Sequence, residues 1–358
     1  MYENKLHFKP VKALGIMSGT SLDGMDMALI ELKAENGNFI YKVLYATTLP
    51  YPEEWILKLK QAPGLSGLEL IILHQKYGEY IGEQALGVIQ KTGIKPDLIA
   101  SHGHTVFHRP HAGITLQIGN GAYIAAKTNT TTVSDFRTLD VALGGQGAPL
   151  VPIGDKLLFG RFEKCLNLGG FSNISFEINE KRLAFDICPV NIALNHFSGF
   201  LGLAFDPEGQ NARNGKINPE LLSELNKLEY YRQSPPKSLG REWLEQVFLP
   251  VTQKHLPDTK DILRTICEHI ADQIVPFGNA ENTILTTGGG SHNNFLMELL
   301  NKRSHNAFYI PNKETVDFKE AIVCACLGIL RTKNLVNCLS SVTGSLKDNC
   351  GGIVHFIK

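Results

Sequence analysis

The sequence predicts an α/β protein of two similar lobes, each a mixed sheet flanked by helices. Three observations support this fold class. Segments in the first half follow the order β-β-β-α-β-α-β. The second half opens with a three-strand meander like that of the first. Glycine is the one compositional excess, with 34 of 358 residues, and it gathers in turns beside the predicted strands and helices. We expect lobes at residues 1–145 and 146–358, with a C-terminal helix around 317–333 packing near the lobe junction.

In the first half, strands are predicted from short apolar or alternating segments bounded by glycine and Asn-Gly turns. They cover residues 12–16, 27–32, 39–48, 97–100, 115–118 and 131–133. Pro52 can occupy the first position of a helix to residue 62. Ser66 and Glu69 form a capping box for a second helix, which Gly93 ends. A third, short helix is expected over 121–128.

The second half repeats this organisation in coarse form. Strands are predicted over 164–168, 174–178, 183–187 and 282–287, and helices over 263–275, 294–301 and 317–331. The last helix is expected to begin at a cap formed by residues 317–320. Residues 230–242 form a proline-rich polar loop. Each half has a glycine-containing turn between its first two strands.

Composition excludes several classes of partner. The chain has 35 basic and 35 acidic residues, so no net field attracts nucleic acid or an acidic membrane. The longest apolar run, 321–330, is far short of the ~20 residues that span a bilayer. The first residues lack the apolar core of a secretory signal. Seven cysteines without a CxxC pair favour reduced thiols, so we expect a cytoplasmic protein.

The turn after the first strand is the sharpest candidate site. It contains Gly19, Thr20, Ser21, Leu22, Asp23 and Gly24. Its backbone N–H groups and hydroxyls can bind phosphate oxygens. Asp23 or Asp26 can reach a phosphate-bound Mg²⁺, which prefers carboxylates and water. Because Asp-Gly turns are common, an ordinary hairpin turn remains the alternative.

A histidine-rich segment, HGHTVFHRPH, resembles a zinc site. His102, His104, His108 and His111 provide imidazoles, which are common zinc ligands. The spacing is not HExxH, and no carboxylate lies within the segment. A zinc hydrolase therefore stays only as an alternative hypothesis.

The chain resembles the anhydro-N-acetylmuramic acid kinases of the actin-like, sugar-kinase and Hsp70 ATPase superfamily. The resemblance is carried in order by GIMSGTSLDGMDMALIEL, SHGHTVFHRP, TLQIG, SDFRTLDVALGGQGAPLVP, LNLGGFSNIS, AFDICPVN, FDPEGQNARNG, PPKSLGRE, GGGSHNNFLMELL, KEAIVCACLGIL and VTG followed by GGI. It implies a two-lobed actin-like (ribonuclease H-like) fold, with nucleotide and sugar bound in the cleft between the lobes.

The resemblance implies a specific reaction. Such kinases open the 1,6-anhydro ring of anhydro-N-acetylmuramic acid with water and phosphorylate O6 from ATP, with Mg²⁺. The product, N-acetylmuramate 6-phosphate, belongs to recycling of cell-wall amino sugar. The resemblance also implies a homodimer.

The resemblance also assigns roles to residues. It implies that ATP phosphates bind to the first hairpin, including Met25 and Asp26. A second phosphate loop would contain Gly169, Gly170 and Asn173. A loop that contacts adenosine would contain Gly288, Gly289, Gly290 and Asn293. Asp186 matches the catalytic base, and Glu320 matches a supporting acid. The sugar pocket is expected from His102, Thr105, Gln117, Asp135 and Arg137.

Physical arguments accompany two of these roles. Asp186 follows the apolar segment 183–185 at the carboxyl end of a predicted strand, where open α/β sheets bind ligands. By itself, an Asp there is usually a turn former. Arg137 suits the lactyl carboxylate of a muramic acid, since guanidinium groups bind carboxylates bidentately. An ion pair with Asp135 or Asp140 is the alternative.

The loop around the expected base departs from the family pattern. The common FDTGPGN is FDICPVN here, so Ile187, Cys188 and Val190 replace threonine and two glycines. His104 replaces a usual glutamine. The lost glycines restrict the loop and leave a kinase for a different amino sugar open as a second hypothesis. A third is an actin-like ATP-binding regulator without turnover. Cys188 is either a reactive thiol or a small buried side chain.

Overall fold

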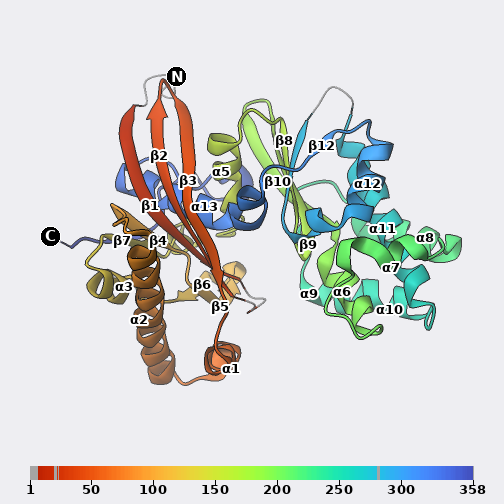
Figure 1. Cartoon of the computed structure of the whole chain (residues 1–358), viewed down its shortest axis with the longest axis horizontal. Coiled ribbons are helices and arrows are strands. Elements are labelled where there is room, and N and C mark those ends of the chain that lie inside the picture. The colour runs from red at the N-terminus through yellow and green to blue at the C-terminus, as the bar shows by residue number, and fades with distance from the viewer. Residues whose placement is uncertain (1–6, 20–21, 23, 280–282, 358) are drawn as a thin grey trace. The chain divides into compact units, whose positions relative to one another are not determined.

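The computed structural model describes residues 7–19, 22, 24–279 and 283–357. The chain divides into two compact units (Figure 1). Unit 1 comprises residues 1–158 and 318–358, and unit 2 comprises residues 159–317. This division differs from the expected boundary after residue 145, and it groups the C-terminal residues with the first unit. The first boundary follows α5 (Val151–Leu158), and the second lies within α13 (Lys313–Thr332).

Unit 1 is built on a six-stranded sheet with the order β13-β7-β4-β1-β2-β3. Its strands are β1 (Phe8–Ser18), β2 (Met25–Glu35), β3 (Asn38–Leu49), β4 (Leu98–Ser101), β7 (Thr132–Ser134) and β13 (Ile353–His355). β1, β4 and β7 are parallel, whereas β2, β3 and β13 pair antiparallel. A separate hairpin joins β5 (His104–Arg109) to β6 (Ile114–Ile118).

Unit 2 has a five-stranded sheet with the order β10-β9-β8-β11-β12. Its strands are β8 (Lys164–Leu168), β9 (Phe171–Ile178), β10 (Lys181–Pro189), β11 (Ile284–Thr287) and β12 (Phe308–Tyr309). β8, β11 and β12 are parallel and β9 and β10 antiparallel. The same arrangement underlies β3-β2-β1-β4-β7 of unit 1. The predicted fold class, two mixed sheets of one topology flanked by helices, is confirmed.

Helices complete both units. In unit 1 they are α1 (Glu53–Gln61), α2 (Gly67–Thr92), α3 (Gly121–Thr128), α4 (Thr138–Ala142), α5 and α14 (Ser340–Thr343), with most of α13. In unit 2 they are α6 (Asn191–Gly199), α7 (Gln210–Asn214), α8 (Pro219–Asn226), α9 (Arg241–Trp243), α10 (Leu249–Gln253), α11 (Thr259–Ile274) and α12 (Asn294–Arg303). None of the described helices is long and apolar enough to cross a membrane.

Alternation along the strands sends residues of the unit 1 sheet to two separate cores. In β1, Ala13 packs in a cluster with residues of α13, whereas Leu14 packs in a cluster with Tyr77 of α2. Successive strand residues point to opposite faces, so one strand serves both cores. Gly15 lets β1 approach α13 closely, because a Cβ there would lie 1.9 Å from the carbonyl oxygen of Ala321. The first glycine of GIMSG therefore serves packing.

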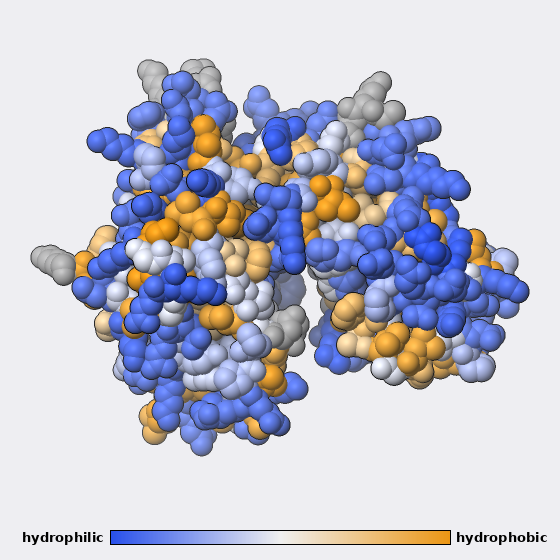
Figure 2. Space-filling view, viewed as in Figure 1, coloured by the Kyte–Doolittle hydropathy of each residue, from blue (hydrophilic) through white to orange (hydrophobic). Residues whose placement is uncertain are grey.

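Local signals explain where several elements begin and end. Ser66 and Glu69 form the predicted capping box of α2, and Gly93 ends this helix in the left-handed conformation. α13 begins at Lys313, before the expected cap at residues 317–320, because the Asn312 side chain accepts a hydrogen bond from the Thr315 N–H (3.0 Å). Hydrophilic residues cover most of the face shown in Figure 2, with apolar residues in small groups.

Candidate active site

Three parallel strands of unit 1 end at one edge of its sheet. β1 ends at Ser18, β4 at Ser101 and β7 at Ser134. The expected phosphate hairpin, the HGHT segment and the SDFR segment each lie at one of these ends. Because parallel strands place their carboxyl ends at a common edge, the sheet brings together residues that the sequence keeps far apart.

The phosphate hairpin is described in part, since Thr20, Ser21 and Asp23 lie outside the described residues. Leu22 has a positive φ of 60° and is buried with Met25 in the core on the α2 side. Because these two side chains are buried, only the backbone groups of Leu22 and Met25 are available to a phosphate.

Beside the hairpin, Gly24 packs against β3, where a Cβ would meet a Thr48 side-chain carbon at 2.7 Å. Thr48 also donates a hydrogen bond to Oδ1 of Asp26 (2.6 Å).

Glu320 belongs to the same unit and lies in α13. Its side chain is solvent-accessible yet surrounded by protein, and this desolvation raises its pKa. Lys319 and Arg137 oppose the shift, and the carboxylate of Asp26 adds to it. Two predicted carboxylates thus influence each other beside the hairpin.

His102 and Arg137 form a buried pair. Nε of Arg137 donates to Nε2 of His102 (2.8 Å), so the neutral imidazole carries its proton on Nδ1 and donates to the Gly103 carbonyl (2.9 Å). Burial first, then the guanidinium, lowers the pKa of His102 to about 3. Arg137 Nη1 donates to the carbonyl of Gly147 (2.6 Å). The structure records no ion pair of Arg137 with Asp135 or Asp140.

The carboxylate of Asp140 is fully buried and joins three segments. Its Oδ2 accepts from the Gly147 N–H (2.8 Å), and its Oδ1 from Thr343 (2.8 Å), Asn349 (2.8 Å) and Cys338 (3.2 Å). Burial raises the pKa of Asp140, but these hydrogen bonds outweigh it and hold the pKa below its ordinary value. Asp140 thus fixes Gly147, whose carbonyl oxygen accepts the hydrogen bond from Arg137. The sequence analysis did not predict this role of Asp140.

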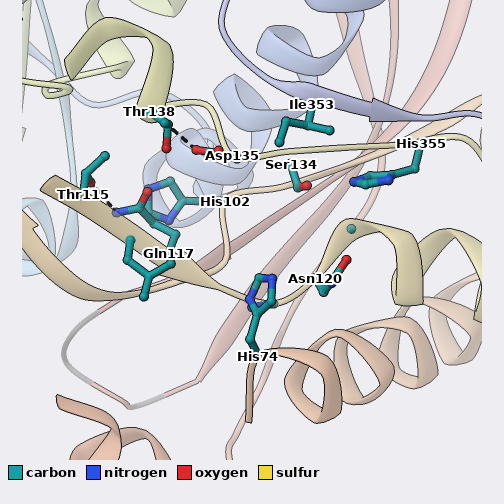
Figure 3. A pocket seen from close by; sticks show the side chains of 13 residues that line it. His74, His102, Thr115, Gln117, Asn120, Ser134, Asp135, Thr138, Ile353 and His355 are labelled. Atoms are coloured by element: carbon teal, nitrogen blue, oxygen red, sulfur yellow. Dashed lines mark hydrogen bonds between the residues drawn. The ribbon is translucent and has the colours of Figure 1, made fainter. Parts of the chain in front are cut away.

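Three of the expected sugar residues line a cavity of about 290 Å³ in unit 1 (Figure 3). His102, Gln117 and Asp135 contribute to its wall. Thr105 lies opposite Gln117 in the β5–β6 hairpin and accepts a long hydrogen bond from it (3.4 Å). Arg137 lies behind this wall, bonded to His102.

The remaining histidines of HGHTVFHRPH have separate partners. His104 is buried and bonded to Ser18 (3.2 Å), and burial lowers its pKa to about 4. His108 is exposed and bonded to Thr115 (3.1 Å), and His111 is also exposed. Among the residues that the structure describes, no three His, Cys, Asp or Glu side chains are grouped to hold a metal ion. This arrangement gives the zinc hydrolase hypothesis no support.

In unit 2, Asp186 lies within β10 and not after its end, which corrects the expected position. β10 continues to Pro189, and the register shifts between Asp186 and Cys188, a bulge of the kind often found beside active sites. Asp186 lies opposite Asn173 of β9. Asn173 in turn lies opposite Asn167 of β8, and Asn167 lies opposite Thr287 of β11. A polar row thus crosses the sheet, and sequence reasoning missed Asn167 in it.

The proline-rich segment contacts the expected base directly. The Leu239 N–H donates to Oδ2 of Asp186 (2.9 Å), and the Asp186 backbone bonds to the Lys237 carbonyl (3.2 Å) and the Tyr230 hydroxyl (2.7 Å). Burial raises the pKa of Asp186, and the Leu239 hydrogen bond opposes the shift. The hydrogen bond to Oδ2 therefore orients the Asp186 carboxylate, and burial makes this carboxylate more basic than that of an ordinary Asp.

The residues that depart from the family pattern pack inward. Ile187, Cys188 and Val190 are buried in the core of unit 2, and none of them has a positive φ. Glycine is therefore not required at these positions. Burial raises the pKa of Cys188 to about 12, and Ser172 is bonded to its sulfur. Cys188 is a protonated core residue, not a reactive thiol.

The expected nucleotide loops meet at the ends of β8 and β11. Gly169 and Gly170 follow β8, and Gly288, Gly289 and Gly290 follow β11. At Gly288, which has a φ of 86°, a Cβ would lie 2.6 Å from the Asn167 side chain. Gly170 and Gly289 are exposed, so a ligand has direct access to their backbone. Asn293 instead caps α12, accepting from the Leu296 N–H (3.0 Å).

A family model described as anhydro-N-acetylmuramic acid kinase matches residues 11–356. The chain belongs to this family. The family protein of Gloeobacter violaceus is 35% identical over 377 residues, covering 97% of this chain and 99% of its own. That of Aliivibrio fischeri is 35% identical over 368 residues, covering 96% and 99%. The chain is therefore a kinase, and the predicted family is confirmed.

Solved structures show weaker similarity. Component A of (R)-2-hydroxyglutaryl-CoA dehydratase from Acidaminococcus fermentans has a TM-score of 0.47 and 11% identity, covering 90% of this chain and 99% of that one. Schistosoma mansoni hexokinase complexed with glucose has a TM-score of 0.33 and 11% identity, covering 90% and 86%. The fold assignment rests on the strand orders described above.

Proposed function

We propose that this family member opens the 1,6-anhydro ring of 1,6-anhydro-N-acetylmuramic acid with water and phosphorylates O6 from ATP. Water attacks C1, the C1–O6 bond breaks, and O6 accepts the γ-phosphoryl group as ADP leaves. The oxygen of the water and one of its hydrogens become the new hydroxyl group on C1. The other hydrogen leaves as a proton, which a carboxylate accepts. The products are N-acetylmuramate 6-phosphate and ADP.

The observation that carries this proposal is the environment of Asp186. A general base needs a carboxylate of raised basicity that is held in one orientation. Burial raises the pKa of Asp186, and the Leu239 N–H holds one oxygen while no described residue hydrogen-bonds the other. We assign that second oxygen to the attacking water.

Unit 1 supplies recognition of the sugar. Arg137 is oriented by His102 and by the Gly147 carbonyl, while its Nη2 makes no hydrogen bond to the described residues. We assign these Nη2 donors to the lactyl carboxylate. His102, Thr105, Gln117 and Asp135 would contact the sugar ring and its substituents.

For ATP we propose the glycine turns of unit 2. The exposed backbone of Gly170 and Gly289 admits a phosphate or nucleoside without steric conflict. Gly169, Gly288 and Gly290 complete these loops, and Asn173 lies beside them. ATP carries Mg²⁺, which neutralises phosphate charge. We assign contact with this ion to the carboxylate of Asp26, supported by Glu320. We further propose a cytoplasmic homodimer, which light scattering tests for its oligomeric part.

The test incubates the protein with Mg-ATP and anhydro-N-acetylmuramic acid and follows products by mass spectrometry. We expect the 6-phosphate sugar from the wild type. Asp186→Asn should lower kcat at least about a thousandfold while ATP affinity is retained, whereas the exposed Asp258→Asn serves as a matched control with wild-type rates. Full turnover by Asp186→Asn would remove Asp186 as the base.

The alternatives predict other outcomes of the same assay. ADP release only with another amino sugar would indicate the second hypothesis, and tight ATP binding without turnover would indicate the regulator. Burial of Ile187 and Val190 removes the structural reason that favoured a different sugar. Arg137→Ala should raise KM for muramyl but not glucosaminyl substrates, and equal loss on both would reject its role.

A further inference from the structure

The cavity of unit 1 has a second side that the proposed sugar residues do not account for. This side is formed by His74 of α2, Asn120 before α3, Ser134 of β7 and His355 of β13, while His102 and Gln117 lie across the cavity (Figure 3). A volume of about 290 Å³ lies near the lower end of small-ligand sites, which span about 300–1,000 Å³. It accommodates a single monosaccharide or part of one.

Ser134 is the first sign of a ligand here. The residue is only 7% exposed, it lines the cavity, and no hydrogen bond joins its side chain to another described residue. A hydroxyl group that faces a cavity without a protein partner can donate its hydrogen bond to a ligand. Gly121 allows the first turn of α3 to lie against this serine, since a Cβ would be 2.4 Å from Ser134 Oγ and 2.7 Å from His355 Cδ2.

His74 offers a second donor with a defined proton. The Gly119 N–H donates to Nδ1 of His74 (3.0 Å), so this nitrogen is an acceptor. Burial lowers the pKa of His74, and the nearby Asp135 only partly offsets the shift. The neutral imidazole therefore carries its proton on Nε2, the nitrogen left for a ligand.

Charge restricts the ligand further. No lysine or arginine is among the described residues that line the cavity, and burial lowers the pKa values of His74, His102 and His355, which keeps all three neutral. Among the described lining residues, Asp135 is the one carboxylate. Its Oδ1 accepts from the Thr138 N–H (3.2 Å), and its backbone has a positive φ of 56°. Such a wall repels an anion and favours a neutral ligand.

We propose that this cavity recognises the C2 acetamido group of the amino sugar. A secondary amide presents one N–H and one carbonyl, which match the acceptor Asp135 and the donors His74 Nε2–H and Ser134 O–H. Leu116 and Ile353, which also line the cavity, are apolar surfaces for the methyl group. The lactyl carboxylate is left to Arg137. This assignment rests on the proposed function and names the specificity site within it.

The test compares two substrates, anhydro-N-acetylmuramic acid and the same anhydro sugar with a hydroxyl group in place of the acetamido group. Ser134→Ala and His74→Phe should each lower kcat/KM for the acetamido sugar about tenfold and change that for the hydroxyl sugar little. Ser198→Ala is the matched control, a buried serine of unit 2 bonded only to the Leu194 carbonyl, and should leave the ratio of the two substrates unchanged.

Equal losses on both substrates in both variants would overturn the acetamido site. If the wild type phosphorylates neither sugar, the proposed function fails, and calorimetric binding of the two sugars then tests the site alone. Binding of the acetamido sugar that Ser134→Ala and His74→Phe weaken would support the site. Undiminished binding, or none by the wild type, would overturn it. Circular dichroism of each variant checks that the fold is kept.

Discussion

Replacing Asp140 by Asn should loosen unit 1 and, through it, Arg137. The carboxylate accepts hydrogen bonds from Gly147, Cys338, Thr343 and Asn349. An Asn side chain has one carbonyl oxygen and turns an NH₂ group toward donors at the other position. Hydrogen bonds to charged groups contribute about 1.5–3 kcal/mol each, and a buried donor left unsatisfied costs about 1–3 kcal/mol. We expect a loss of about 3 kcal/mol.

Thermal unfolding followed by circular dichroism measures this loss. For a unit of this size, each kcal/mol lost from the free energy of unfolding lowers Tm by about 2–4 °C. The Tm of unit 1 should therefore fall by about 6–12 °C. Hydrogen exchange should accelerate at Gly147 and in residues 338–349. Because the pKa of Asp140 is lowered in the folded chain, its contribution is present above the unfolded pKa of about 3.9 and is lost as the pH falls through the lower folded value.

The difference in stability between wild type and Asp140→Asn should therefore shrink under acidic conditions. Ser345→Ala, which removes a neighbouring hydroxyl and leaves the carboxylate intact, is the control and should cost less. An unchanged unfolding temperature together with unchanged exchange at Gly147 would refute the reasoning. It would show that the four hydrogen bonds do not join the segments in solution.

Three further predictions concern separate parts of the chain. Leu239→Pro removes the N–H that lowers the pKa of Asp186, so the acidic limb of the pH–rate profile should move to higher pH; an unmoved limb would contradict this. Gly15→Ala places a Cβ 1.9 Å from the Ala321 carbonyl oxygen and should cost at least the ~1–3 kcal/mol of overpacking in urea unfolding, whereas Gly87→Ala, in open space, should not destabilise. Cys188 should resist alkylation at pH 8 until the chain unfolds, and rapid labelling of the native protein would disprove its burial.

Local signals predicted a large part of the fold. The capping box of Ser66 and Glu69 and the left-handed Gly93 lie within or beside the helix that they define, so the sequence displays them directly. The repeated meander predicted the common topology of both units. Boundaries were less accurate where pairing continues past the apolar residues, as in β9, which begins at Phe171 because Ser172 still pairs with Leu168.

The hydrogen-bond partners of the predicted site residues depend on contacts distant in sequence. Leu239 is 53 residues from the Asp186 that it orients, and Arg137 is 35 residues from His102. Asn349 is 209 residues from Asp140. No periodicity or spacing encodes such pairs, because the sheet edge and the returning C-terminal segment create them. Asp140 and Asn167 were missed for this reason.

The shared topology of the two sheets does not fix the strand on which a carboxylate lies. At one register of each sheet, the first three strands carry Met17, Asp26 and Thr48 in unit 1 and Asn167, Asn173 and Asp186 in unit 2. The carboxylate in unit 1, Asp26, is on the middle strand of the three, whereas the carboxylate in unit 2, Asp186, is on the outer strand. Because each sheet packs in a core of its own, each unit can keep its fold while the residues of its polar row change. The same strand order therefore supports a carboxylate at either of two strand positions, Asp26 on β2 and Asp186 on β10.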